Sequence, residues 1–384
     1  MSDKLKQKGR DVAVLGVGMH PFGRFPEKGF IQLGRKALEK ALEDAGMEDA
    51  RAIEAVAYSH TMGQTIAAGE LVQYEFGMSG IPVLGNIENA CSSSSTAVWL
   101  ANRLISGGFY DVIAVIGTEK MPEGAFEDPM KALPDRYLGV GLIMGLYAMR
   151  ARRYMRDYGA PVEALAQVSV KAHHWGIYNP YAQFKKEITV ADVLNARVIA
   201  DPLTLFMCSP TGEGAAAMIL CAADVASKYS SKPLVRIAGS SLVSEKYEDG
   251  RAECYPENTE RAGKEAYEQA GLGPKDIDLA ELHDAAAIAE IIRAEALGLC
   301  PVGEGWKYTM EGKTDRDGSI PLNISGGLKA CGHPLGATGA RQIAELTWHL
   351  RNEAGERQVP NAKVGLAETA GFGGVDCVHI LVRD

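Results

Sequence analysis

The chain alternates short apolar segments with longer segments that mix polar and apolar residues. Eight apolar segments are nearly continuous, a pattern typical of strands in sheets that helices cover on both faces. These segments lie at residues 12–18, 53–61, 111–118, 214–222, 234–240, 277–285, 362–369 and 374–382. The pattern predicts an α/β fold built on buried sheets.

The two halves of the chain repeat one order of elements. The amphipathic segment ALEKALEDAGM (37–47) resembles AGKEAYEQAGL (262–272), and the apolar segments 53–61 and 277–285 follow them at nearly the same spacing. Unrelated matches would rarely keep register, so we interpret the chain as an internal duplication. Each half reads strand, helix, strand, helix, strand, strand, which predicts a duplicated β-α-β-α-β-β core.

One insertion interrupts the first copy. Between Glu119 and about Pro210 the chain carries a long segment rich in aromatic residues, methionine and charge. A segment of this length between adjacent strands is normally a lid or substrate loop with helices of its own. We therefore expect an N-terminal core half (1–119 with 210–230), an inserted loop domain (120–209) and a C-terminal core half (231–384).

The charge and the cysteines exclude several classes of function. A net charge of −9 gives no basic footprint for nucleic acid or for an anionic membrane surface. The polar first ten residues are no signal-peptide core, and the apolar run VGLIMGLYAM is too short to cross a bilayer. Seven scattered cysteines suit free thiols in a reducing compartment, so we expect a cytoplasmic protein.

Cys91 is the first candidate for chemistry. It lies in NACSSSST, where serines suited to cap a helix precede a helical run that ends at Gly107 and Gly108. At a helix N-terminus, free backbone N–H groups and the helix dipole favour a thiolate, so we expect a pKa below the ordinary value of roughly 8.5. The alternative is a buried structural cysteine before a capped helix.

The second copy of this turn is SGGLKACGHPLGATGA (325–340), which contains Cys331 and His333. Its small residues allow close approach, and Pro334 holds the preceding backbone extended. Equivalent turns of a pseudo-symmetric core can lie near each other, which would bring Cys91 within reach of His333 and Cys331. The alternative is a histidine satisfied within the core.

Two further motifs end strands. His283 closes the strand IDLAEL, at the edge where α/β sheets place their sites, and Asp284 could cap the next helix. The turn GFGG (371–374) lies between two strands, and its backbone N–H groups can point at an oxyanion. In the insertion, His173 and His174 are predicted to be solvated or lid residues. We assign no role to the other four histidines, which are His20, His60, His349 and His379.

These residues resemble the thiolase superfamily, and within it the sterol-carrier-protein-type thiolases with their bacterial and archaeal acetyl-CoA acyltransferase-like relatives. Four motifs carry the resemblance: NACSSSST, ELHDA, SGGLKACGHPLGATGA and ETAGFGGVDCVHILV. The resemblance covers nearly the whole chain and implies a layered α/β/α/β/α core. It also implies coenzyme A as co-substrate, with no permanently bound cofactor and no metal.

The resemblance assigns roles to the motif residues. Cys91 would attack the 3-oxo carbon of a 3-oxoacyl-CoA, and His333, with a water positioned by His283, would hold the enolate oxygen that follows. The backbone N–H groups of Cys91 and Gly371 would hold the acyl oxygen of the intermediate.

A second acid/base is needed as well, and the chain departs from the family at both usual positions for it. Thr369 and Ala285 stand where relatives carry a cysteine. We therefore expect Cys331 to take over this role.

Two other functions compete with a thiolase. Loss of both usual acid/base cysteines favours a thiolase-like aldolase that cleaves a CoA thioester without an acyl-enzyme, whereas retention of Cys91 opposes it. A non-catalytic acyl-CoA-binding scaffold would retain the fold alone. The resemblance further implies a homodimer or homotetramer and a small partner protein with a zinc ribbon and an OB-fold. The aromatic insertion suits a bulky, branched or aromatic acyl group, or lid packing.

Overall fold

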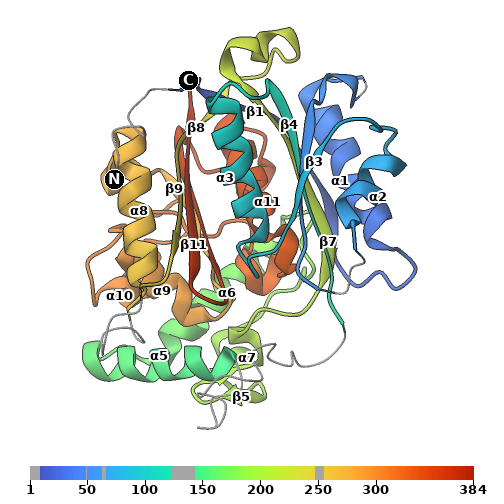
Figure 1. Ribbon diagram of the computed structural model, residues 1–384. Helices are drawn as coiled ribbons and strands as arrows, with labels where there is room; N and C mark the ends of the chain where they lie inside the picture. The colour runs from blue at the N-terminus through green and yellow to red at the C-terminus, as the bar shows by residue number, and fades with distance from the viewer. Residues whose placement is uncertain (1–8, 49, 63–65, 123–142, 247–254) are drawn as a thin grey trace.

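The computed structural model of the chain describes residues 9–48, 50–62, 66–122, 143–246 and 255–384 (Figure 1). Within these ranges no helix has both the length and the apolar character needed to cross a membrane.

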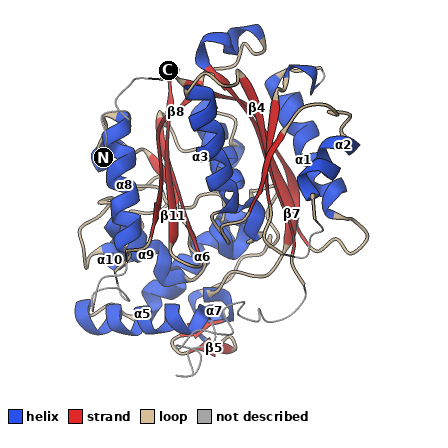
Figure 2. Ribbon diagram, in the orientation of Figure 1, coloured by secondary structure: helices blue, strands red, loops and turns tan. Residues whose placement is uncertain are grey.

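Nine strands form one hydrogen-bonded sheet in the order β3-β2-β4-β7-β1-β8-β11-β10-β9. Their bounds are β1 Val12–Gly23, β2 Ala55–Ser59, β3 Val83–Ile87, β4 Val112–Lys120, β7 Glu213–Ala222, β8 Val235–Ser244, β9 Leu279–Glu281, β10 Val364–Gly371 and β11 Val375–Arg383. The two halves join where β1 pairs with β8, through Ala13–Arg236 and Val14–Val235. Away from this joint the sheet separates into two layers (Figure 2).

The strand order confirms the duplication. The first half runs β2-β4-β7-β1 and the second runs β9-β10-β11-β8, so corresponding strands hold corresponding places. In each half the first of these pairs is parallel and the next two are antiparallel. The eight apolar segments of the sequence become these eight strands, and β3 is an added edge strand of the first half that the pattern did not predict.

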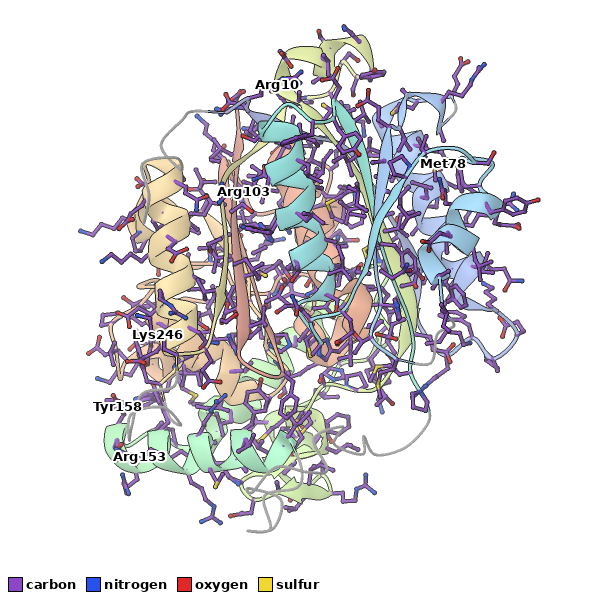
Figure 3. The ribbon with its side chains drawn as sticks, viewed as in Figure 1. Arg10, Met78, Arg103, Arg153, Tyr158 and Lys246 are labelled. Atoms are coloured by element: carbon purple, nitrogen blue, oxygen red, sulfur yellow. The ribbon has the colours of Figure 1, made fainter. Side chains whose placement is uncertain are left out.

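Helices complete five layers, as Figure 1 shows. Helix α3 (Ser93–Ser106) and helix α11 (Thr338–Arg351) lie between the two sheet layers. Helices α1 (Phe30–Ala45) and α2 (Ala68–Glu75) cover one outer face, and α8 (Glu257–Ala270) covers the other. In Figure 3, Arg103 of α3 points toward the β8 layer, where its guanidinium donates to the Ser240 carbonyl at 3.2 Å. The predicted α/β/α/β/α core is confirmed.

The described part of the insertion is largely helical. It comprises α5 Ile143–Tyr158, α6 Val162–Ile177, α7 Val190–Leu194, β5 Val198–Ala200 and β6 Leu203–Thr204. Its buried apolar side chains form one cluster with those of α9 (Ala287–Ala296) in the second half, and α10 (Gly305–Met310) also packs against α6. Residues 123–142 of the predicted insertion lie outside the described residues. The division into three parts stays a prediction.

One predicted strand is shorter than its apolar pattern. Within the segment 277–285 only β9 (Leu279–Glu281) is a strand. After Glu281 the backbone N–H groups donate to side chains instead of to a neighbouring strand. The N–H of Leu282 donates to Asn323 Oδ1 at 2.8 Å, and that of His283 donates to Glu368 Oε2 at 3.0 Å. The change of partner turns His283 out of the sheet at its carboxyl edge.

Candidate active site

Cys91 is held in a tight turn between β3 and α3. Ala90 before it has φ of +49°, a left-handed conformation that is costly for a residue with a Cβ. The Ala90 carbonyl accepts the hydroxyls of Ser93 at 2.6 Å and Thr61 at 3.2 Å, which stabilise the turn. Cys91 therefore lies just before the helix, as predicted, although Ser92 at the N-cap makes no side-chain cap bond.

His333 approaches from the equivalent turn of the second half. Its Nδ1 lies 2.8 Å from Thr338 Oγ1, and the Thr338 hydroxyl donates to the Pro334 carbonyl at 3.0 Å. Because that hydroxyl has one proton and uses it on Pro334, it accepts from Nδ1–H. In the neutral ring this leaves a lone pair on Nε2.

Three of the four predicted side chains meet. Cys91 Sγ lies 3.2 Å from His333 Nε2, and His283 Nε2 lies 3.4 Å from the same nitrogen. The two imidazole rings meet edge to face, with centroids 5.1 Å apart. His283 and His333 are buried and Cys91 is half-buried. The lone pair of His333 thus faces the thiol.

Burial determines the protonation of this group. It raises the pKa of Cys91 to about 12, and contacts with the backbone N–H groups of Phe372 and Cys91 only partly oppose it. The sequence-based expectation of a lowered pKa is therefore wrong for the free protein, since desolvation outweighs the helix terminus. Burial also lowers the pKa of His333 to about 3. At neutral pH the pair rests as thiol and neutral imidazole, so the thiol can transfer its proton to His333 as it attacks.

Asp284, beside His283, does not cap the following helix. Its carboxylate accepts the Leu328 N–H at 2.8 Å and pairs with the buried Lys329 ammonium. Helix α9 begins at Ala287, with Ala286 at the N-cap. The aspartate thus joins the His283 loop to the turn that leads to His333.

The last glycine turn forms another wall of the site. Gly371 and Phe372 line the same cavity as Cys91, and the Phe372 amide contacts the Cys91 sulfur. A Cβ on Gly371 would lie 3.3 Å from Ser92 Cβ, so this turn packs closely on the nucleophile loop. The oxyanion role of the Cys91 and Gly371 amides stays a prediction.

Cys331 does not join the group. Its side chain is fully buried in the core, where Asn179 Nδ2 lies 3.8 Å from its sulfur, and it is absent from the cavity wall. The small-residue segment forms a short π-helix at Gly327–Cys331, and Cys331 ends it inside the core. The expectation that Cys331 supplies the second acid/base therefore loses its geometric basis.

Thr369, at one family cysteine position, offers no substitute. It is buried, its hydroxyl oxygen accepts from Ser95 Oγ at 2.9 Å, and the same hydroxyl bonds Gln342. Ala285, at the other position, does line the cavity but carries no titratable group. Both usual positions are thus occupied by residues that cannot exchange a proton with a substrate.

The cavity has a volume of about 1790 Å³ and is lined by Cys91 and by residues of α5. The sequence missed several of its features because their residues belong to no motif. His173 is buried in the wall and stacked on Phe184 at 14°, so it is not solvated, whereas His174 is half-exposed and pairs with Glu187. Lys246 lies at the wall beside α8 (Figure 3). Cys208 also lines the cavity.

The expectation of no metal stays a prediction. Cys91, His283 and His333 place one ligand atom each within 4.8 Å of one another, which suits proton transfer and is also close enough for one ion.

Comparisons with known proteins identify the family. The thiolase N-terminal domain model matches residues 12–224, and the thiolase C-terminal domain-like model matches residues 241–383. Among solved structures, an Ltp2–ChsH2(DUF35) aldolase superposes with a TM-score of 0.86 at 24% identity over 98% of both chains. A monomeric SCP2-thiolase-like protein from Mycobacterium smegmatis gives 0.75 at 21% identity, over 97% of this chain and 77% of that one. These likenesses show the fold.

Curated relatives are closer in sequence. An acetyl-CoA acetyltransferase from Methanothermobacter thermautotrophicus is 39% identical over 97% of this chain and 100% of its own. Benzoylsuccinyl-CoA thiolase subunit BbsB from Thauera aromatica is 38% identical over 95% of each chain. Bovine sterol carrier protein 2 is 37% identical over 96% of this chain and 72% of its own. The chain belongs to the thiolase family, as an acyltransferase.

Proposed function

We propose that this chain cleaves a 3-oxoacyl-CoA with coenzyme A through an acyl-Cys91 intermediate, or runs the reverse Claisen condensation. The observation that carries the proposal is the 3.2 Å contact between Cys91 Sγ and His333 Nε2, with His333 Nδ1 anchored on Thr338. A thiol, a base and a group that orients the base are the three parts that nucleophilic catalysis requires.

The first step uses the resting protonation of this pair. Cys91 gives its proton to His333 Nε2 as the sulfur attacks the 3-oxo carbon. The tetrahedral adduct collapses by breaking the bond between the α and β carbons, which leaves the acyl group on Cys91 and releases an enolate.

The two histidines then stabilise the enolate. His333, now protonated, and His283, through a water, would donate to its thioester oxygen, and each donor aimed at such a developing charge is typically worth about 3 kcal/mol. The amides of Cys91 and Gly371 would hold the acyl oxygen. Coenzyme A, as co-substrate rather than bound cofactor, then removes the acyl group.

The cavity supports a bulky, branched or aromatic acyl group. Its volume of about 1790 Å³ exceeds the ordinary range of small-ligand sites, roughly 300–1,000 Å³, and must also admit coenzyme A. Apolar side chains of the insertion line it, among them Met144, Tyr147, Met149, Phe184 and Phe206.

Assembly is part of the proposal. A homodimer or homotetramer, and a small zinc-ribbon and OB-fold partner, remain expectations from the family. The aldolase neighbour, Ltp2–ChsH2(DUF35), is named as a pairing with a DUF35 protein, which supports the expectation of a partner. The six described cysteines are free thiols, which suits a reducing, cytoplasmic compartment.

Mass spectrometry of the intact protein tests the mechanism. Mixed with a panel of 3-oxoacyl-CoA esters, the protein should gain the mass of the acyl group on Cys91, and bulky esters should turn over with coenzyme A. His333→Gln removes the base, so acylation should slow by about 10²–10⁴-fold. The matched control is His174→Gln, because His174 is a half-exposed histidine of the insertion. This variant should form acyl-Cys91 at the wild-type rate.

Other outcomes separate the competing functions. Cleavage without an adduct would indicate the aldolase, and binding of CoA esters without cleavage would indicate the scaffold.

A further inference from the structure

The proposed function lacks one group, a second acid/base. The enolate must gain a proton and coenzyme A must lose one. Ala285 and Thr369 cannot do this, and Cys331 lies outside the cavity. Another group of the cavity wall must therefore give a proton and take it back.

Cys208 lies beside the position of the missing cysteine. Its backbone forms an antiparallel bridge with Ala286, and the next amide, of Ser209, donates to the Ala285 carbonyl at 2.9 Å. Cys208 and Ala285 both line the cavity that holds Cys91, His283 and His333. A thiol is thus present on the segment that pairs with Ala286, instead of at Ala285 itself.

The segment that carries Cys208 is fixed in place. Thr204 is buried and its hydroxyl donates to the Val193 carbonyl at 2.7 Å, and Met207 is fully buried. The Cys208 thiol donates to the Thr204 carbonyl at 3.5 Å, and the residue stays partly exposed. The backbone of Cys208 is therefore held firmly, and its thiol would exchange the Thr204 carbonyl for the substrate when it gives up its proton.

Neighbouring cavity groups are already engaged. The Lys329 ammonium pairs with Asp284, and His173 Nδ1 lies 3.2 Å from the Lys186 carbonyl. Burial raises the pKa of Cys208 to about 11, and the positive charge of Lys329 opposes this rise. The group therefore begins a cycle as a protonated thiol, the form that a proton donor to an enolate requires.

We propose, resting on the proposed function, that Cys208 is the second acid/base of this enzyme. After the α–β bond breaks, the Cys208 thiol gives its proton to the α carbon of the enolate, which releases the shortened acyl-CoA and leaves a Cys208 thiolate. Incoming coenzyme A gives its thiol proton to that thiolate and attacks acyl-Cys91. The Cys91 sulfur leaves and recovers its proton from His333, so every group returns to its first state.

Hydrogen exchange at the α carbon separates this role from acylation. In D₂O the wild type should exchange the α protons of acetyl-CoA and thiolyse 3-oxoacyl-CoA. Cys208→Ala should lose about 10²–10⁴-fold in both rates, while single-turnover acylation of Cys91 by a 3-oxoacyl-CoA, which precedes the Cys208 step, stays within a few-fold. Cys300→Ala, a buried thiol outside the cavity wall, is the matched control and should change none of the three rates.

Two variants make the test decisive. Ala285→Cys in the Cys208→Ala background restores a thiol on the neighbouring segment and should recover part of the exchange. If Cys208→Ala does not fold, Cys208→Ser should show the same separation of exchange from acylation.

Several results would overturn the inference. Exchange and thiolysis within about fivefold of wild type in a folded Cys208 variant would do so, and so would their loss in Cys331→Ala alone. Failure of the wild type to form acyl-Cys91 would instead contradict the proposed function itself.

Discussion

At the scale of single residues, Glu119 at the end of β4 links the loops of the site. Its carboxyl is fully buried and accepts the amides of Met62 and Gly336, each at 2.9 Å. Gly336 follows His333 in the same loop, and Thr61 next to Met62 bonds the turn before Cys91. Glu119 therefore fixes the distance between nucleophile and base without lining the cavity.

Glu119→Gln should destabilise the protein, most strongly at mildly acidic pH. The amide offers one acceptor where two N–H groups need one each, which costs about 1–3 kcal/mol. Burial raises the pKa of Glu119 from 4.5 to about 7, so the folded state holds a proton that the unfolded chain loses near pH 4.5. The stability that this carboxyl contributes is present below about pH 4.5 and falls as the pH rises to about 7, whereas glutamine contributes no such slope.

Urea unfolding at pH 5 and pH 8 measures this difference. The difference in free energy of unfolding between wild type and Glu119→Gln should be smaller at pH 8 than at pH 5. The control Glu163→Gln, on the exposed side of α6, should unfold with the same free energy as wild type at both pH values. If the free energy of unfolding changed with pH equally in wild type and Glu119→Gln, Glu119 would not have the raised pKa that we assign to it.

The sequence predicted Cys91, His283 and His333 because each lies in a motif that ends an element. It assigned the second acid/base to Cys331, which lies in a motif, and did not consider Cys208, which lies in none. Which of them reaches the cavity depends on how the insertion packs, and no local pattern records that packing. The prediction of a lowered pKa for Cys91 was wrong for the same reason. The position of Cys91 at the start of a helix was predicted correctly, but a local pattern does not record the desolvation that distant segments impose.

At the scale of elements, helix packing places the two catalytic turns. Helices α3 and α11 were predicted from the small-residue runs after each turn, and those small residues let the helices meet. A Cβ on Gly339 of α11 would lie 2.6 Å from the Ser95 backbone nitrogen of α3, closer than side chains tolerate. Edge elements such as α2 and β3 escaped prediction because they are short and only partly buried.

Gly339→Ala should separate the helices and weaken catalysis. An added methyl group in a close-packed contact costs about 1–3 kcal/mol, and a shift of about 1 Å between reacting groups can cost about 100-fold in rate. We expect Cys91 acylation to fall by about that factor while the protein stays folded. Gly145→Ala on α5, whose Cβ would meet nothing within 4 Å, should leave the acylation rate unchanged. Equal rates for both variants would show that the helix contact does not set the geometry of the site.

At the scale of the whole molecule, the duplication made the repeated order of strands predictable. Long-range contacts that join the halves were not predictable, because they pair side chains hundreds of positions apart. Arg351 ends α11 in the second half and reaches across to the first. It donates to the carbonyls of Val14 at 2.7 Å and Leu15 at 2.9 Å, and it pairs with Asp44 of α1 at 2.9 Å.

Arg351→Met should lower the stability of the whole protein and keep unfolding in one transition. Removing one partner of a buried ion pair costs roughly 3–5 kcal/mol, and we expect the lower end because Lys232 still pairs with Asp44. Calorimetry together with circular dichroism should give coincident curves at a reduced midpoint, since the central helices α3 and α11 belong to both sheet layers. Arg236→Met, which breaks a half-exposed pair with Asp384, should cost less than about 1 kcal/mol. Two separated transitions would mean that the halves fold independently and that the site between them forms only on their docking.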